Sequence, residues 1–173
     1  EMSVTVDVLK TMKLDWPRIE TADAWISLGI DRDLNKALDL LKAQTVKLLM
    51  EQRKLSAEQA DKVMMDTWDC RVSQVVDVNK GLHCFTAKGD PRKTEPLPER
   101  ENDVYLVTVG KDADLNKAMD SASWDMINLL EKDKKLSRLD AYALVSMVMD
   151  CRPAAPTGPT ASSPGSRTAR SSM

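Results

Sequence analysis

His83 is the single histidine of the chain and the first side chain to consider for proton transfer or metal binding. An imidazole can act as a general base or as a zinc ligand near neutral pH. One histidine excludes histidine-rich metal sites, so a zinc site would have to combine His83 with distant cysteine or carboxylate ligands. The Lys-Gly turn before His83 fits a hydrogen bond at a strand end at least as well, and we favour that structural role.

The three cysteines, Cys70, Cys84 and Cys151, are the other candidate nucleophiles. Their count is odd and they form no close pairing motif, which predicts reduced thiols in an intracellular protein. Cys70 and Cys151 follow apolar segments at the ends of two predicted helices, where buried structural thiols are more common than catalytic ones. We therefore assign no catalysis to the cysteines.

Charged residues close to these positions indicate structure rather than catalysis. Asp69 with Arg71, and Asp150 with Arg152, have the spacing of structural ion pairs. The segments 29–31 and 110–112 lack the glycine spacing of a phosphate-binding loop, so no nucleotide site is expected.

The net charge is −2 and basic residues alternate with acidic ones, which argues against nucleic-acid partners. No apolar run is long enough to predict a membrane span.

The elements that must position these residues come in two copies. Residues 29–71 recur without a gap at 110–152, an offset of 81 positions: Asp33-Leu34-Asn35-Lys36-Ala37 returns as residues 114–118 with the same letters. Ungapped self-similarity of this kind indicates a tandem duplication. We expect a first unit at 1–88, a linker at 89–100, a truncated second unit at 101–152 and a tail at 153–173.

Hydrophobic periodicity predicts a mixed α/β fold built of strand-helix-helix-strand units. In the first unit we expect strands at 3–9, 24–28 and 72–77, a helix from residue 33 and a second helix at 56–68 that starts with a capping box. In the second unit we expect a strand at 104–109 and helices at 114–132 and 137–150. The Pro/Ser-rich tail lacks large aliphatic residues, which predicts disorder and a second unit without its final strand.

The run from Asp69 to His83, together with residues 16–20 and 33–37, resembles the C-terminal region of the acetamidase/formamidase family. In that family a run of the form Asp-x-Arg-Val-Ser/Thr-Gln-Val-Val-Asp-x-x-Lys-Gly-Val/Leu-His closes the last helix and enters the final strand. The second copy matches through Asp150-Cys151-Arg152 and then departs. The residues of this chain that carry the family signature are Asp69, Arg71, Gln74, Asp77, Lys80, Gly81 and His83.

The resemblance implies a cytoplasmic, oligomeric hydrolase that converts short linear amides such as formamide and acetamide to a carboxylate and ammonia. It implies zinc or another divalent metal in some complete relatives, whereas this chain is expected to hold no metal or cofactor. The larger upstream part of the family enzymes has no counterpart here, so we expect a fragment that is inactive alone. Its weak catalytic candidates are His83 and Glu20, a carboxylate for which a solvated strand edge is the favoured interpretation.

An alternative hypothesis is a non-catalytic oligomerisation or assembly module derived from an amidase. We consider it because the duplicated unit can form a surface but contains no set of catalytic residues. The expected partners are a small amide in the complete enzyme, and either further copies of this chain or an amidase subunit.

Overall fold

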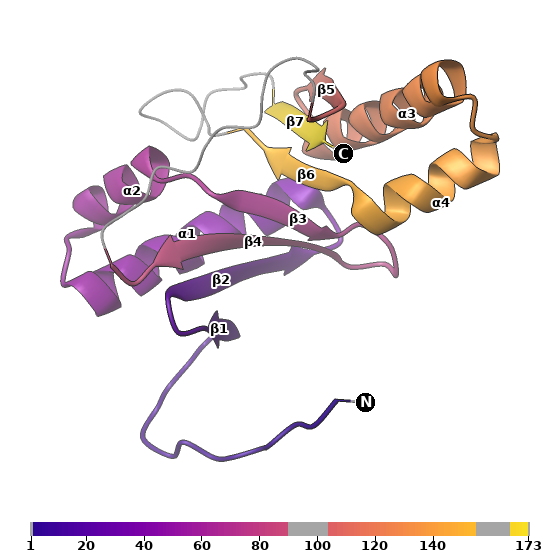
Figure 1. The fold of residues 1–173 in the computed structure, drawn as a ribbon. Helices are drawn as coiled ribbons and strands as arrows, with labels where there is room; N and C mark the ends of the chain where they lie inside the picture. The colour runs from indigo at the N-terminus through magenta and orange to yellow at the C-terminus, as the bar shows by residue number, and fades with distance from the viewer. Residues whose placement is uncertain (1, 90–103, 155–166, 173) are drawn as a thin grey trace.

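The computed structural model describes residues 2–89 and 104–154, and the backbone of residues 167–172. Across these residues the protein is a mixed α/β structure with four helices, a four-stranded antiparallel sheet and a three-stranded antiparallel sheet. Figure 1 shows the two sheets as parts of two adjoining halves, each with its own pair of helices. We call residues 18–87 the first half and residues 107–172 the second half.

The first half contains β1 (Arg18–Glu20), β2 (Ala24–Asp31), α1 (Leu34–Arg53), α2 (Ala57–Asp66), β3 (Cys70–Gln74) and β4 (Lys80–Ala87). Its strands lie in the order β1-β2-β4-β3. The second half contains β5 (Val107–Asp112), α3 (Leu115–Lys134), α4 (Arg138–Val148), β6 (Asp150–Pro153) and β7 (Arg167–Ser172), with strand order β5-β7-β6. From β2 to β4 the elements follow in the order strand, helix, helix, strand, strand. The elements from β5 to β7 follow in the same order.

Local sequence signals explain where the helices begin and end. Asp33 accepts a hydrogen bond from the backbone N–H of Asn35 at the start of α1, and the left-handed residue Lys54 (φ 56°) ends that helix. The predicted capping box is confirmed, because Ser56 and Gln59 bond each other's backbone at the start of α2. The second predicted helix of each half ends two residues early, at Asp66 and Val148, because the chain turns there into β3 and β6.

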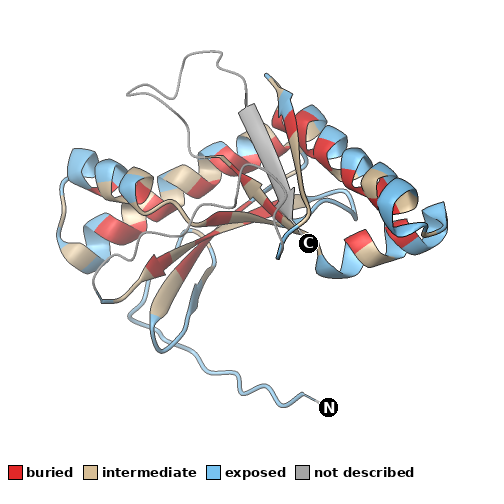
Figure 2. Ribbon diagram, turned by 45° about the horizontal axis from the view of Figure 1, so that its top comes forward, coloured by how far each residue is buried: buried red, intermediate tan, exposed pale blue. Residues whose placement is uncertain are grey.

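Each first helix packs on its preceding strand through a glycine. A Cβ atom added at Gly29 would lie 2.1 Å from the backbone oxygen of Ala37, and one added at Gly110 would lie 1.8 Å from that of Ala118. Both distances are far below a van der Waals contact, so only glycine allows these helices to approach their strands this closely. Figure 2 shows the resulting buried residues as bands along the inner sides of α1 and α3.

The two halves meet where α1 and α3 begin. The side-chain amide of Asn35 donates to Asp33 and to Asp114, and that of Asn116 donates to the same two carboxylates, all at 2.8 Å. Each asparagine carbonyl in turn accepts the first backbone N–H of the opposite helix. Behind this cluster a shared core contains leucine, alanine and methionine side chains of both helices: Leu34, Ala37, Leu38, Leu41, Leu115, Ala118, Met119 and Ala122.

Two expectations about the chain ends are wrong. Residues 2–15 are exposed and form no strand, with Val4, Val6 and Val8 at 70, 87 and 72% exposure, because β1 already pairs with the outer edge of β2. The tail predicted to be disordered contributes the end of β6 and the whole of β7, so the second half does not lack its final strand. A central strand is held by backbone hydrogen bonds on both sides, which Ser, Thr and Arg can make as well as aliphatic residues.

Other boundaries shift by smaller amounts. The strand expected at 72–77 is β3 and stops at Gln74, because Asp77 and Val78 take left-handed conformations (φ 61° and 72°) in the turn to β4. The strand expected at 104–109 lies at Val107–Asp112. Of the expected linker at 89–100, only Gly89 falls in the described residues, and residues 155–166 of the tail also lie outside them.

We expect Gly29→Ala to lower the free energy of unfolding by about 1–3 kcal/mol, the usual cost of an added methyl group in a packed interior. Urea denaturation measures this loss. Gly89→Ala is the matched control, since a Cβ there meets no atom within 4 Å. Equal stability of the two variants would contradict the close approach of α1 to β2.

The cluster of Asp33, Asn35, Asp114 and Asn116 between the helices also predicts that the stability of the fold depends on pH. Hydrogen bonds from Asn116 and Asn35 lower the pKa of Asp114 from 3.8 to about 2, and a hydrogen bond from Asn116 leads those that lower the pKa of Asp33. A lowered pKa means that the carboxylate stabilises the fold above pH 3.8 and that this contribution is lost as the pH falls toward about 2. Urea unfolding followed from pH 5 to pH 2 should show a shallower loss in Asp114→Asn than in the parent chain. Parallel curves for the two proteins would contradict this role.

Candidate functional site

The hairpin of β3 and β4 carries the best-placed reactive groups. Val72 pairs with Leu82 and Gln74 pairs with Gly81, so Ser73 is the extra residue of a β-bulge in β3. A bulge turns a side chain away from the regular alternation of the strand. Ser73 is also two residues after Arg71, the cross-strand partner of His83, and its Oγ lies 2.8 Å from His83 Nδ1 on the neighbouring strand.

His83 is held in a state suited to accept a proton. Burial lowers the pKa of His83 below its ordinary value of 6.5, and the positive charge of Arg71 lowers it further, while Asp69 and Asp150 act in the opposite direction. The imidazole is therefore neutral at neutral pH. With the proton on Nε2, its Nδ1 accepts the Ser73 hydroxyl, which is the arrangement of a nucleophile and its base.

Aromatic and charged neighbours fix this face of the hairpin. The ring of Phe85 lies edge-on to His83 at 5.1 Å, and the guanidinium of Arg71 lies over the Phe85 ring at 5.2 Å. Arg71 pairs with Asp69 at 3.1 Å and reaches Asp150 of β6 at 3.8 Å. Arg152 pairs with Asp150 at 2.6 Å, so both expected pairs are present, and the contact of Arg71 to Asp150 also joins the two halves.

The remaining residues of the Asp69–His83 run build the turn rather than the reactive pair. The amide of Gln74 donates to the backbone oxygens of Val76 and Asn79, which closes the loop that contains Asp77. Lys80 donates to the side-chain oxygen of Asn116 and so ties the turn to the cluster between the helices. Gly81 pairs with Ile30 in β2 and with Gln74 in β3.

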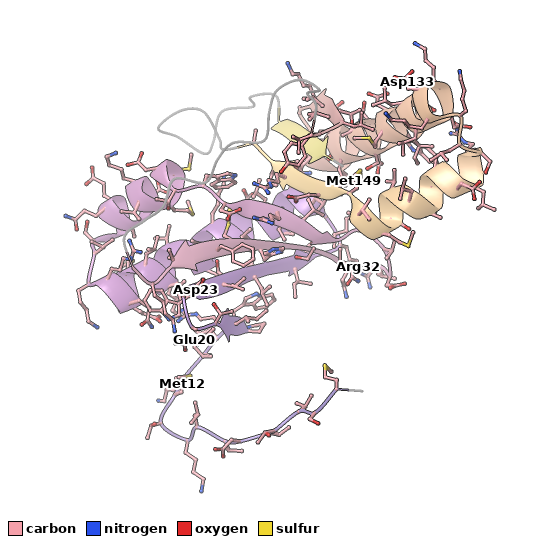
Figure 3. All side chains as sticks on the ribbon, viewed as in Figure 1. Met12, Glu20, Asp23, Arg32, Asp133 and Met149 are labelled. Atoms are coloured by element: carbon pink, nitrogen blue, oxygen red, sulfur yellow. A yellow bond between two sulfur atoms is a disulfide. The ribbon has the colours of Figure 1, made fainter. Side chains whose placement is uncertain are left out.

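Glu20, the second catalytic candidate, does not join His83. It lies in β1, which is separated from β4 by β2, and Figure 3 shows it at the far edge of the sheet. Its carboxylate forms an ion pair with Lys88 at 2.5 Å, and this hydrogen bond lowers the pKa of Glu20. The favoured interpretation of a solvated strand edge therefore describes Glu20 well.

The expectation of three reduced thiols is wrong for two of the cysteines. Cys70 and Cys84 are directly opposed in β3 and β4, with Cα atoms 4.1 Å apart, and they form a disulfide. Their separation of 14 residues gives no motif in the sequence, because the pairing depends on the hairpin register. Cys151 is a free, buried thiol, and burial raises its pKa to about 12, so it is no nucleophile at neutral pH.

No group of three or more His, Cys, Asp or Glu side chains in residues 2–89, 104–154 and 167–172 is placed to hold a metal ion. These residues do not fit the zinc site that the family resemblance implies for complete relatives. The same part of the chain contains no helix long and apolar enough to cross a membrane.

Comparison of the chain with protein-family models, curated proteins and solved structures finds no match. The interpretation of the hairpin therefore depends on its own geometry and on the residues of the Asp69–His83 run.

A small cavity adjoins Ser73. It has a volume of about 130 Å³ and is lined by apolar residues of β2 and by Ser73, Gln74 and Lys80, among others. A water molecule occupies about 30 Å³ in the liquid, so the cavity has room for a molecule of a few heavy atoms. Ser73 was missed as a candidate, because its approach to His83 depends on the register of β3 against β4, which has no signal in the sequence of either strand.

We expect the Cys70–Cys84 disulfide to stabilise the hairpin by about 3 kcal/mol, the value for a closed loop of this length. Urea denaturation of the parent chain should therefore shift to lower urea when a reductant is added. The double variant Cys70→Ser/Cys84→Ser should unfold at that lower urea concentration with or without reductant. A reductant effect that persists in the double variant would show that another bond is responsible.

Proposed function

We propose that this chain belongs to hydrolases of short linear amides, with Ser73 as nucleophile and His83 as its general base. The hydrogen bond of 2.8 Å between Ser73 Oγ and His83 Nδ1 is the observation that carries this proposal. The resemblance of the Asp69–His83 run to acetamidase/formamidase enzymes supports the substrate class. The cavity of about 130 Å³ beside Ser73 suits substrates of the size of formamide and acetamide.

In this reaction His83 Nδ1 accepts the hydroxyl proton while Ser73 Oγ attacks the amide carbonyl carbon. Collapse of the tetrahedral intermediate breaks the carbon–nitrogen bond, and the proton held by His83 leaves with the amine as ammonia. The acyl group now on Ser73 is transferred to a water molecule that His83 activates in the same way. The products are one carboxylic acid and one ammonia for each amide and water consumed.

A serine and its base supply only part of an amidase site, since the developing oxyanion also needs hydrogen-bond donors. Two donor side chains that line the cavity are already engaged, Gln74 with backbone oxygens of its own turn and Lys80 with Asn116. We therefore expect slow amide turnover by the isolated chain, and propose that further copies or an amidase subunit complete the site.

The proposal includes a cytoplasmic location and the origin of the two halves by duplication of one unit. A second candidate function, a non-catalytic assembly module, is favoured by the apolar side chains that this chain leaves exposed. Val4, Val6 and Val8 alternate along the N-terminal segment at 70–87% exposure, and Ile19 in the edge strand β1 is 48% exposed. Surfaces of this kind are commonly covered by a partner.

The reactive pair predicts that Ser73 is acylated by p-nitrophenyl acetate, an activated ester that needs less oxyanion stabilisation than an amide. Mass spectrometry should find the acetyl group on Ser73. Its rate of formation should fall about 100-fold or more in His83→Gln, the usual contribution of a general base. Because the pKa of His83 is lowered, the rate should rise with pH to a midpoint below 6.5, and Arg71→Gln should move that midpoint upward.

Ser121→Ala removes an exposed serine of α3 and serves as the matched control, with unchanged labelling of Ser73 expected. Labelling of Ser73 no faster than that of exposed serines would reject the reactive pair and leave the assembly module as the better proposal. Ammonia release from formamide and acetamide, lost in Ser73→Ala, then tests the substrate class.

A further inference from the structure

A larger cavity lies between the β3–β4 hairpin and the helices of the second half. Its volume is about 520 Å³, within the range of small-molecule sites. Much of its wall is apolar and comes from β3, the following turn, α3, α4 and the residue after α4: Val72, Val76, Met119, Ile127, Val145 and Met149. Figure 3 labels Met149 at the junction of α4 and β6.

One of the differences between the two halves lies at the wall of this cavity. By the offset of 81 positions, Met149 corresponds to Trp68, and Val72 corresponds to Pro153. Trp68 packs between the shared core and the core of α1 and α2, as Met149 packs between the shared core and that of α3 and α4. The indole N–H of Trp68 donates to the backbone oxygen of Pro153 at 2.9 Å. Met149 has no such donor and a slimmer side chain, and it lines the cavity.

The charges around the cavity select among possible ligands. Asp77 and Asp120 line it, and among residues 2–89 and 104–154 no lysine, arginine or histidine does. The guanidinium of Arg138 lies over the ring of the lining residue Trp124 at 5.1 Å, and it is paired with Glu131 at 2.7 Å. An acidic, apolar cavity favours a ligand with a positive charge and disfavours a carboxylate.

We propose that this cavity binds a flat aromatic amine, with an indole-sized ring beside Met149 and an ammonium group near Asp120 and Asp77. The ring takes the position that the Trp68 side chain occupies in the first half. The proposal is independent of amide hydrolysis, since Met149 and Asp120 have no part in the reactive pair.

Isothermal titration calorimetry with tryptamine and indole-3-acetate tests the proposal, because the two probes share a ring and differ in the sign of their charge. Tryptamine should bind at least about tenfold more tightly than indole-3-acetate, a difference that the two carboxylates can supply. Met149→Trp should weaken tryptamine binding at least about tenfold without lowering the melting temperature. Met147→Trp, two residues earlier in α4 but 73% exposed and outside the cavity wall, should bind like the parent chain.

Asp120→Asn changes the charge with little change in shape, and keeps the proposal testable if the tryptophan variant does not fold. It should remove most of the preference for tryptamine over indole-3-acetate. Three results would each overturn the proposal: no tryptamine binding by the parent chain, equal binding of the two probes, or undiminished binding by a folded Met149→Trp variant.

Discussion

The structure depends on how two helix N-termini are held together. Each N-terminus carries unpaired N–H groups and about half a positive charge, so two that meet repel each other unless acceptors lie between them. Asp33 and Asp114 provide the negative charge, and Asn35 and Asn116 donate to both carboxylates. Because each asparagine also accepts a backbone N–H of the other helix, the groups that cap the helices are the same groups that join the halves.

This junction places the elements from which the two candidate sites are built. With α1 and α3 held end to end, β3 and β6 lie next to each other, and Arg71 reaches Asp150 across them. The hairpin turn is tied to the same junction by the contact between Lys80 and Asn116. Both Ser73 and the wall of the larger cavity therefore depend on contacts that lie outside the hairpin itself.

The helices could be predicted from the sequence because their signals are local. Asp33 and Ser56 mark two starts by side-chain bonds within three residues, and the apolar face of α1 recurs at helical spacing. The features that were missed depend on residues far apart in the chain or on backbone geometry. The Cys70–Cys84 bond needs the strand register, and β7 needs neighbours on both sides rather than apolar side chains. The alternation of Val4, Val6 and Val8 failed for the converse reason, since no sheet face lies beneath it.

The differences between the halves explain where chemistry can reside. At the offset of 81 positions Ala154 stands where the first half has Ser73, so the second half has no hydroxyl at that position. The first half in turn has Trp68, whose indole donates to Pro153, where the second has Met149, which lines the larger cavity. The hydroxyl and Met149 come from different halves, and they meet because Ser73 lines that cavity as well as the smaller one. The sequence difference at position 73 thus places a hydroxyl in the wall of a cavity to which both halves contribute.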